Sequence, residues 1–201
     1  HSTPSLRVPA YEYRRERWKN GGGWTREILA LPSPTGWTLR LSIAEIEAAS
    51  TYSALPGVMR EQVLLSGNGL RLDFDGGETV ELLPPHDRVR FDGHRAVTGA
   101  PLDGPAQAFN LMWRPHALAA TLLHRPLVGG MFCFADVDTA WAVHLLGGTA
   151  RITGQDVDFR LEGGDTAWLA AGRRQRFAVD GAGEALMVRV DLAGGRGDGA
   201  G

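Results

Sequence analysis

One stretch of the sequence, residues 17–27, places polar side chains around three consecutive glycines. It reads Arg-Trp-Lys-Asn-Gly-Gly-Gly-Trp-Thr-Arg-Glu, so Lys19 offers an ammonium group and Asn20 a carboxamide beside a backbone that glycine leaves unusually free. A phosphate-binding loop is excluded, because the glycines lack the Gly-Lys-Ser/Thr ending that such a loop needs. We therefore expect a turn that brings backbone amides, Lys19 and Asn20 close to a polar ligand.

Arg40 is the third candidate for holding an anion. Apolar and polar residues alternate over residues 37–43, which puts Arg40 and Ser42 on one face of a strand and three leucine or isoleucine side chains on the other. Each candidate also has an ordinary alternative. Lys19 could be a solvated loop lysine, Asn20 a residue that holds its own turn, and Arg40 a partner of a surface carboxylate.

The sequence carries no local signature of a catalyst or of a metal cluster. Cys133 is the single cysteine and is set between phenylalanines, which favours burial over nucleophilic chemistry. The histidines at positions 86, 94, 116, 124 and 144 lack the paired spacing of metal ligands. No Ser-His-Asp or Cys-His set is apparent, so we name no catalytic residue, and His144 is interpreted as a hydrogen-bonded core histidine.

Composition and charge narrow the class of protein. The 201 residues are 43% hydrophobic, which is enough for one large core or two small ones. A formal net charge of -2 gives no overall attraction for nucleic acid or an anionic membrane. No apolar run approaches the roughly 20 residues of a membrane-spanning helix. The first residues lack the charged and apolar regions of a secretion signal, so we expect a cytoplasmic protein.

The elements that must position the candidate residues are short strands. The 27 glycines and 11 prolines divide the chain into alternating runs, which predict an all-β fold. Strands are expected at residues 37–43, 62–66, 69–74, 79–83 and 106–112, and again at residues 139–146, 158–162, 166–169 and 185–190. A short helix is expected at residues 116–123, which are rich in Ala and Leu.

The second series of strands repeats the first, which predicts two tandem units. We expect the first domain at residues 6–114, the second at residues 128–192, and a flexible glycine-rich tail at residues 193–201.

The order of strands and turns resembles the cupin barrel, a small double-sheet jelly roll. Over the whole chain the sequence resembles the HutD/Ves family of bacterial bicupins, through residues 18–27, 40–44, 55–60 and 109–112. That resemblance implies two tandem cupin barrels and a link to histidine utilisation or to stress response. One departure is Ala108, which stands where the family tends to have an acidic residue.

The resemblance to cupins also locates the positions that a metal would use. Metal cupins place two histidines and a glutamate ahead of the turn glycine, and a third histidine later in the chain. Here the glutamate position falls on Arg60 and the first two histidine positions fall within residues 53–56; in the second unit the corresponding positions include Ala140 and Gln175. These residues are not metal ligands, and Arg60 would repel a divalent ion. We expect neither a metal nor another cofactor.

A cupin interior without a metal must neutralise a bound carboxylate with cationic side chains and amide donors. We therefore expect a small anion to bind to Lys19, Asn20, Arg40, Ser42, Arg60 and Asn110, of which the first three are the principal candidates. The resemblance to HutD implies N-formylglutamate or formate as the ligand, and a regulatory or accessory role.

Two other functions remain open at this stage. One is a metal-independent isomerase or hydrolase that uses Lys19, His144 or a carboxylate. The other is a protein-interaction module whose barrels serve only as a scaffold. Cupins often pair through exposed barrel edges, so the resemblance also allows a homodimer.

Overall fold

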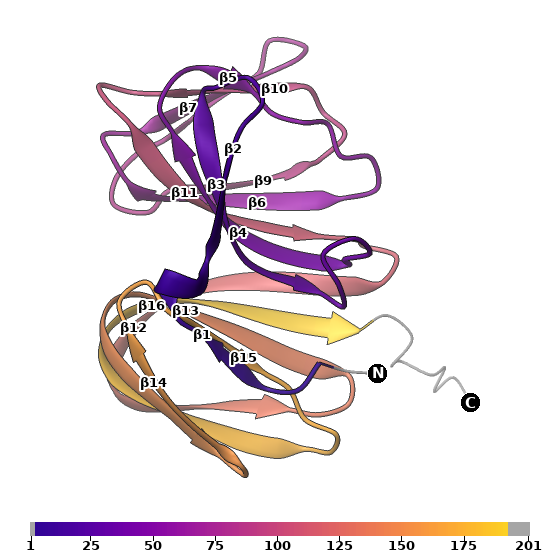
Figure 1. Cartoon of the computed structure of the whole chain (residues 1–201), viewed down its shortest axis with the longest axis vertical. Helices are drawn as coiled ribbons and strands as arrows, with labels where there is room; N and C mark the ends of the chain where they lie inside the picture. The colour runs from indigo at the N-terminus through magenta and orange to yellow at the C-terminus, as the bar shows by residue number, and fades with distance from the viewer. Residues whose placement is uncertain (1–2, 193–201) are drawn as a thin grey trace. The chain divides into compact units, whose positions relative to one another are not determined.

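The computed structural model describes residues 3–192, and the regular elements among these residues are strands, apart from one turn of 3-10 helix, Ala10–Glu12 (η1) (Figure 1). The all-β prediction is confirmed. The tail expected at residues 193–201 lies outside the described residues. No helix in residues 3–192 is long and apolar enough to cross a membrane.

The chain divides into two compact units. The first unit runs from Tyr13 to Pro115, and the second combines residues 3–12 with residues 116–192. The segment from residue 6 to residue 12, which the sequence places with the first domain, therefore belongs to the second unit.

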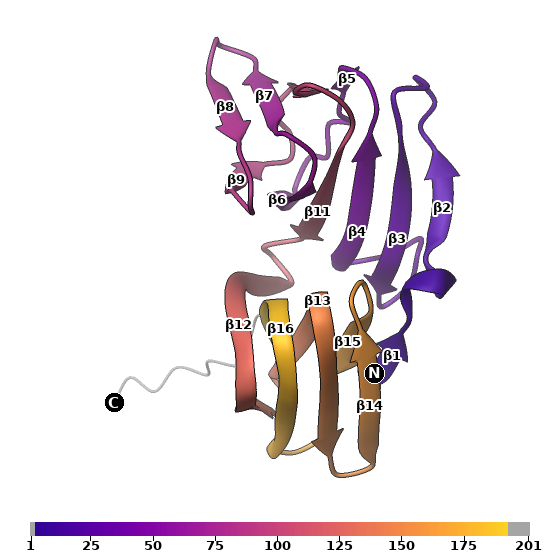
Figure 2. The same ribbon diagram turned by 90° about the vertical axis from the view of Figure 1, so that its left-hand side faces the viewer.

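The first unit consists of two antiparallel sheets, which Figure 2 shows side by side. The larger sheet has the order β2-β3-β4-β11-β6-β9 and the bounds Arg14–Arg17 (β2), Gly23–Leu31 (β3), Leu39–Ile46 (β4), Ala106–Trp113 (β11), Met59–Ser66 (β6) and Arg88–Asp92 (β9). The smaller sheet has the order β5-β10-β7-β8, with Ser50–Thr51 (β5), Val97–Pro101 (β10), Leu70–Phe74 (β7) and Thr79–Leu82 (β8). An apolar core contains residues from both sheets, including Ile46 and Leu64 from the larger and Leu72 and Phe74 from the smaller.

The register of β4, β11 and β6 arranges the inward-facing residues of the larger sheet in layers, because directly opposed residues share a face. Met112 is opposite both Arg40 and Arg60, and Asn110 is opposite both Ser42 and Gln62. The next layers are Ala108 with Ala44 and Leu64, and then Ala106 with Ile46. The interior is therefore polar at one end and apolar at the other. Ala108 lies in the apolar part and is fully buried.

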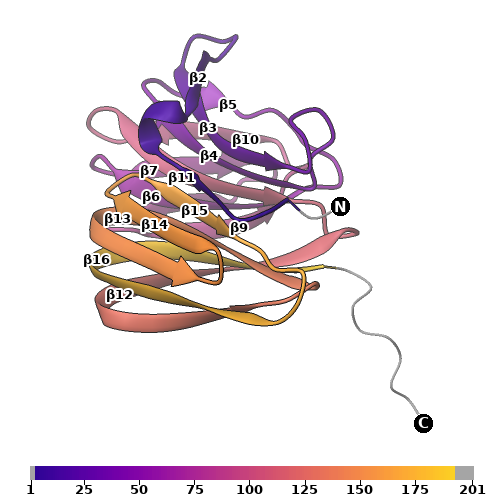
Figure 3. The same cartoon turned by 60° about the horizontal axis from the view of Figure 1, so that its bottom comes forward.

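The second unit is built on three long strands, Leu118–Ala135 (β12), Thr139–Gly154 (β13) and Gln175–Leu192 (β16), which curve around it (Figure 3). The sheet order is β1-β15-β13-β16-β12, with Leu6–Val8 (β1), Thr166–Leu169 (β15) and, paired to β13, Val157–Glu162 (β14). Its core is apolar, with Val143, Leu145, Ile152, Phe177 and Met187 each fully buried.

The helix expected at residues 116–123 is not formed, because this segment is the beginning of β12. Leu118, Ala120 and Leu122 are buried in alternation with more exposed neighbours, which is the period of a strand. All of β12 pairs with β16 in an unbroken antiparallel register. Long-range pairing thus outweighs the local helix preference of alanine and leucine, because helix propensities differ by only tenths of a kcal/mol for each residue, roughly 0.7 at most.

The N-terminal segment is fastened to the second unit by β1 and by Asp165. Leu6 is paired with Trp168 in the β1–β15 ladder. The buried Asp165 carboxylate accepts a hydrogen bond from the Ala10 amide (2.8 Å) and another from the Glu162 amide (2.9 Å). The contact with Ala10 joins residues 155 positions apart, so the second unit needs both ends of the chain.

Candidate anion-binding site

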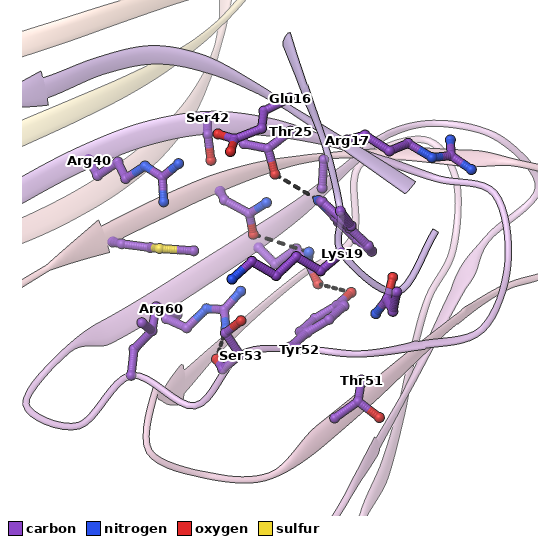
Figure 4. Close-up of a pocket in the computed structure, with 17 residues that line it drawn as sticks. Glu16, Arg17, Lys19, Thr25, Arg40, Ser42, Thr51, Tyr52, Ser53 and Arg60 are labelled. Carbon is purple, nitrogen blue, oxygen red and sulfur yellow. Dashed lines mark hydrogen bonds between the residues drawn. The ribbon is translucent and has the colours of Figure 1, made fainter. Parts of the chain in front are cut away.

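A cavity of about 500 Å³ opens at the polar end of the first unit's interior (Figure 4). The turn between β2 and β3 contributes to its wall together with β4, β6, β11 and the segment after β5. All six sequence-predicted residues line this one cavity: Lys19, Asn20, Arg40, Ser42, Arg60 and Asn110.

The glycine-rich stretch is a tight turn that brings Trp18 and Lys19 to the cavity. The Trp18 amide donates to the Gly23 carbonyl (3.0 Å), which closes the turn, and Gly23 begins β3. A Cβ on Gly23 would lie 2.3 Å from the backbone oxygen of Glu45 on the adjacent strand, so only glycine fits there. The Trp18 indole donates to Thr25 Oγ1 (2.8 Å) and meets the Tyr52 ring edge-on at 6.3 Å between centroids.

Arg60 is a buried cation without a carboxylate partner. Its side chain comes from β6 and only 7% of the residue is exposed. Within residues 3–192 its guanidinium makes a long contact from Nη1 to the Ser53 carbonyl (3.5 Å), and Nε has no partner. The guanidinium packs over the rings of Tyr52 and Phe91, each centroid at 5.2 Å. Burial lowers the pKa of Arg60 to about 10; the Tyr52 phenol opposes this shift, and the nearby charge of Arg40 adds to it.

Beside Arg60, a chain of hydrogen bonds ends on an amide group at the cavity. The Tyr52 hydroxyl donates to Gln62 Oε1 (3.2 Å), and Gln62 Nε2 donates to Asn110 Oδ1 (3.1 Å). Burial raises the pKa of Tyr52 to about 12, so the phenol keeps its proton at neutral pH. This direction of donation occupies the oxygen of Asn110 and leaves its NH₂ group as a donor toward the cavity.

Arg40 differs from Arg60 because it has a carboxylate partner, which it shares with Arg14. Arg40 Nε lies 3.2 Å from Glu27 Oε1, and Glu27 Oε2 lies 3.1 Å from Arg14. The carboxylate of Glu27 therefore fixes Arg40 in the wall of the cavity and neutralises much of its charge. The ordinary interpretation of Arg40, in which the arginine pairs with a carboxylate, is therefore the one that the structure shows.

Lys19 and Asn20 are exposed at the cavity rim. The Lys19 side chain extends toward Arg60, and no described carboxylate forms an ion pair with it (Figure 4). Asn20 holds its own turn, because its Oδ1 accepts a hydrogen bond from the Gly22 amide (2.9 Å). His144, by contrast, lies in β13 of the second unit, where it is buried and within 2.8 Å of Thr166 Oγ1.

Sequence reasoning missed Gln62, Tyr52 and Glu16 as lining residues. Gln62 could have been found if the strand expected from residue 62 had been extended back to Arg60, as β6 shows, because residues two positions apart in a strand share a face. Tyr52 carries no such signal, since it approaches the cavity from irregular backbone after β5.

The cavity is chemically suited to an anion. The described lining residues include four cations, Arg17, Lys19, Arg40 and Arg60, and one carboxylate, Glu16, but neither a histidine nor a cysteine. Arg17 is ion-paired with Glu47 at 2.6 Å. Hard divalent ions need several oxygen ligands of negative charge and transition metals prefer imidazole or thiolate, so this set of side chains fits a carboxylate better than a metal.

Comparison with known proteins adds to this geometry. The family model described as HutD matches residues 10–187. An uncharacterized 21.2 kDa protein in the hutC 3′ region of Pseudomonas putida is 39% identical over 115 residues, 56% of this chain and 60% of that protein. Protein Ves of Cronobacter sakazakii is 35% identical over 98 residues, 48% of this chain and 54% of its own length. The chain therefore spans little more than half the length of these two relatives in the matched alignments.

Two solved structures resemble the chain along most of its length. The structure of HutD from Pseudomonas fluorescens SBW25, obtained in a formate condition, has a TM-score of 0.81 and 26% identity and covers 94% of this chain and 100% of that one. Oxalate decarboxylase of Bacillus subtilis has a TM-score of 0.64 at 9% identity and covers 95% of this chain and 78% of that one, a likeness that shows the bicupin fold alone.

Proposed function

From the premise that this chain belongs to the HutD family, we propose that it binds a small carboxylate in the cavity of the first unit and serves as a regulatory or accessory protein in histidine utilisation. The family and its link by name to the hutC region support the pathway. The ligand and the role rest on the chemistry of the cavity.

The observation that carries the proposal is the buried, unpaired guanidinium of Arg60. Removing a cation from water is expensive unless a counter-charge replaces the lost hydration, and effective penalties reach several kcal/mol. A protein that keeps such a cation at the wall of a cavity has a ready place for an anion. The bound carboxylate supplies the partner that none of the described side chains supplies.

The neighbouring groups define how a carboxylate is held. The guanidinium of Arg60 and the NH₂ group of Asn110 donate to its oxygens, and the Lys19 ammonium closes the site from the rim. The cavity of about 500 Å³ admits ligands larger than formate, including N-formylglutamate. Formate, the compound named in the condition of the Pseudomonas fluorescens HutD structure, is the smallest carboxylate that this arrangement accommodates.

Isothermal titration calorimetry with formate, glutamate and N-formylglutamate tests the proposal directly. A charge-assisted hydrogen bond contributes about 1.5–3 kcal/mol, so Arg60→Gln is expected to weaken binding by roughly one to two powers of ten. Arg71→Gln is the matched control, because Arg71 is a half-exposed strand arginine outside the cavity. Absence of binding to the wild type, or equal affinity in both variants, would contradict carboxylate binding at this cavity.

A further inference from the structure

The outer face of the β12–β16 ribbon carries exposed aromatic side chains between opposite charges. Phe132 is 55% exposed and Phe134 is 48% exposed, although their neighbours Cys133 and Ala135 on the opposite face of the strand are buried. Across the ladder Phe134 is opposite Arg176, Phe132 is opposite Ala178, and Gly130 is opposite Asp180. Along this face the pattern on β16 is therefore a cation, a small residue and an anion.

Both charges on this face are available to a partner. Arg176 stacks over the Phe132 ring, with 4.5 Å between the guanidinium carbon and the ring centroid. Neither Arg176 nor Asp180 forms an ion pair with another residue in the described range 3–192. Arg151, which is opposite Asp180 on β13, is already held by Asp158 through two hydrogen bonds of 2.9 and 2.8 Å.

We propose that this face is the docking surface for a second copy of the chain, related by a two-fold axis that passes through the Phe132–Ala178 pair. A two-fold axis that passes through this pair and reverses the strand direction brings Arg176 over Asp180 of the partner copy. It also brings Asp180 over Arg176 of the partner copy, so the two ion pairs form together. The charges are complementary only in this antiparallel arrangement, because parallel stacking would oppose like charges.

The same axis brings aromatic side chains of the two copies together. Phe134 and Gly130 are each two residues from Phe132 on opposite sides, a separation of about 7 Å along the strand. The axis therefore places the Phe134 ring, over which Arg174 packs at 5.1 Å, near Gly130 of the partner copy, where Asp180 Oδ1 lies 2.6 Å from the position that a Cβ would take. The two Phe132 rings, each with Arg176 over one face, lie near the centre. Aromatic pairs of this kind contribute beyond the area that they bury.

The small area of the β12–β16 face limits the affinity of the proposed dimer. Stable dimers bury about 1,200–2,000 Å² in total, and two strands with a few large side chains provide the low end of that range. The dimer is therefore weak and forms in a concentration-dependent manner. This inference concerns the second unit and does not depend on carboxylate binding in the first.

Sedimentation equilibrium of the full chain, from micromolar to near-millimolar concentration, tests the proposal. The wild type is expected to shift from monomer to dimer, and Phe132→Asp to remain monomeric. Tyr11→Asp is the matched control, because Tyr11 is an aromatic residue of the same unit that is 82% exposed and lies outside this face. A wild type that stays monomeric throughout, or a Phe132→Asp variant that dimerises like the control, would overturn the proposal.

Charge reversal then tests the axis itself. Arg176→Asp and Asp180→Arg are each expected to weaken dimerisation about tenfold, since each puts like charges together twice. The double variant re-forms both pairs with their signs exchanged and is expected to recover most of the wild-type affinity. If the double variant is weaker than either single variant, the two residues do not meet across a two-fold axis and the proposed arrangement is wrong.

Discussion

Arg60 illustrates a conflict between folding and binding at the scale of a single residue. Its guanidinium is buried without a carboxylate, and its Nε lacks a hydrogen-bond partner. Replacing it with methionine keeps most of the volume and removes the desolvated charge. We expect Arg60→Met to raise the free energy of unfolding by about 1 kcal/mol in the absence of anions while it abolishes carboxylate binding.

Urea unfolding in a buffer of large, weakly binding anions, followed by calorimetry with formate, measures both effects. Arg71→Met serves as the control for removal of an exposed cation. An Arg60→Met variant that is less stable than the wild type would mean that the folded state needs the charge itself.

The lowered pKa of Arg60 predicts an unusual pH dependence of binding. An ordinary arginine stays charged even in strongly alkaline solution, whereas burial lowers the pKa of Arg60 to about 10. The cation is therefore present below about pH 10 and is lost as the pH rises through that value. We expect the affinity for carboxylates to fall about tenfold for each pH unit above 10.

The measurement is best made in the Lys19→Met variant, which removes the ammonium group at the cavity rim and leaves Arg60 as the cation under test. Far-UV circular dichroism at each pH confirms that the protein stays folded. An affinity that remains constant to pH 11.5 or beyond, roughly 1.5 units above this pKa, would show that Arg60 keeps its charge or does not bind the ligand.

The six residues proposed from the sequence all line the cavity, but their order of importance differs from the one expected, because Arg60 was not among the principal candidates. Alternation in strands placed Arg40 and Ser42 on one face, and the structure has them at the cavity. Alternation could not reveal the ion pair between Glu27 and Arg40. The two residues lie on adjacent strands, and the register between these strands shifts at a bulge between Glu27 and Leu29. Burial and pairing distinguish Arg60 from Arg40, and both depend on the tertiary structure.

At the scale of elements, the turn between β2 and β3 depends on close backbone approach. A Cβ on Gly22 would lie 1.8 Å from Ser50 Oγ, a side-chain atom, whereas a Cβ on Gly23 would lie 2.3 Å from the Glu45 carbonyl, a backbone atom. We expect each alanine substitution to destabilise the protein by about 2 kcal/mol, because the surrounding structure must shift.

A double-mutant cycle with Ser50→Ala separates the two positions. Removal of the hydroxyl is expected to relieve most of the effect of Gly22→Ala and none of the effect of Gly23→Ala. Gly172→Ala is the control, because nothing lies within 4 Å of a Cβ there. Equal relief at both glycines, measured by urea unfolding, would contradict the contacts described.

Strand prediction succeeded where one face of a strand was clearly apolar and failed where pairing decided the structure. The expected strands at residues 69–74, 106–112 and 166–169 correspond to β7, β11 and β15. The helix expected at residues 116–123 was wrong because β16 provides an antiparallel partner for its whole length, and that partner is distant in the sequence, as the pairing of Leu118 with Leu192 shows.

At the scale of the whole molecule, Asp165 holds the N-terminal strand in the second unit. Its carboxylate accepts hydrogen bonds from the backbone amides of Ala10 and Glu162. Charge-assisted hydrogen bonds contribute about 1.5–3 kcal/mol each, so Asp165→Ala is expected to destabilise the protein by about 3 kcal/mol. The loss should also release β1 and expose the bond after Arg7 to trypsin.

Limited proteolysis with mass spectrometry checks this expectation. Asp158→Ala is the control, because Asp158 is an exposed aspartate of the same unit whose partner is a surface arginine. Equal rates of cleavage after Arg7 in the two variants would show that Asp165 does not hold the strand. Sequence reasoning could not foresee this attachment, since no local pattern connects residues 6–8 with residues 166–168.

The layered interior of the first unit has a consequence for how such proteins diverge. The residues that line the cavity and those that form the core occupy different layers of the same three strands. Drift in the polar layers can therefore change the preferred metabolite while the hydrophobic layers keep the chain foldable. A library that varies positions 40, 42, 60, 62, 110 and 112 only among polar side chains of similar volume is thus expected to retain folded variants with altered ligand preference, because five of these positions are buried and tolerate little change in size. Such variants would make this barrel a starting point for new biosensors.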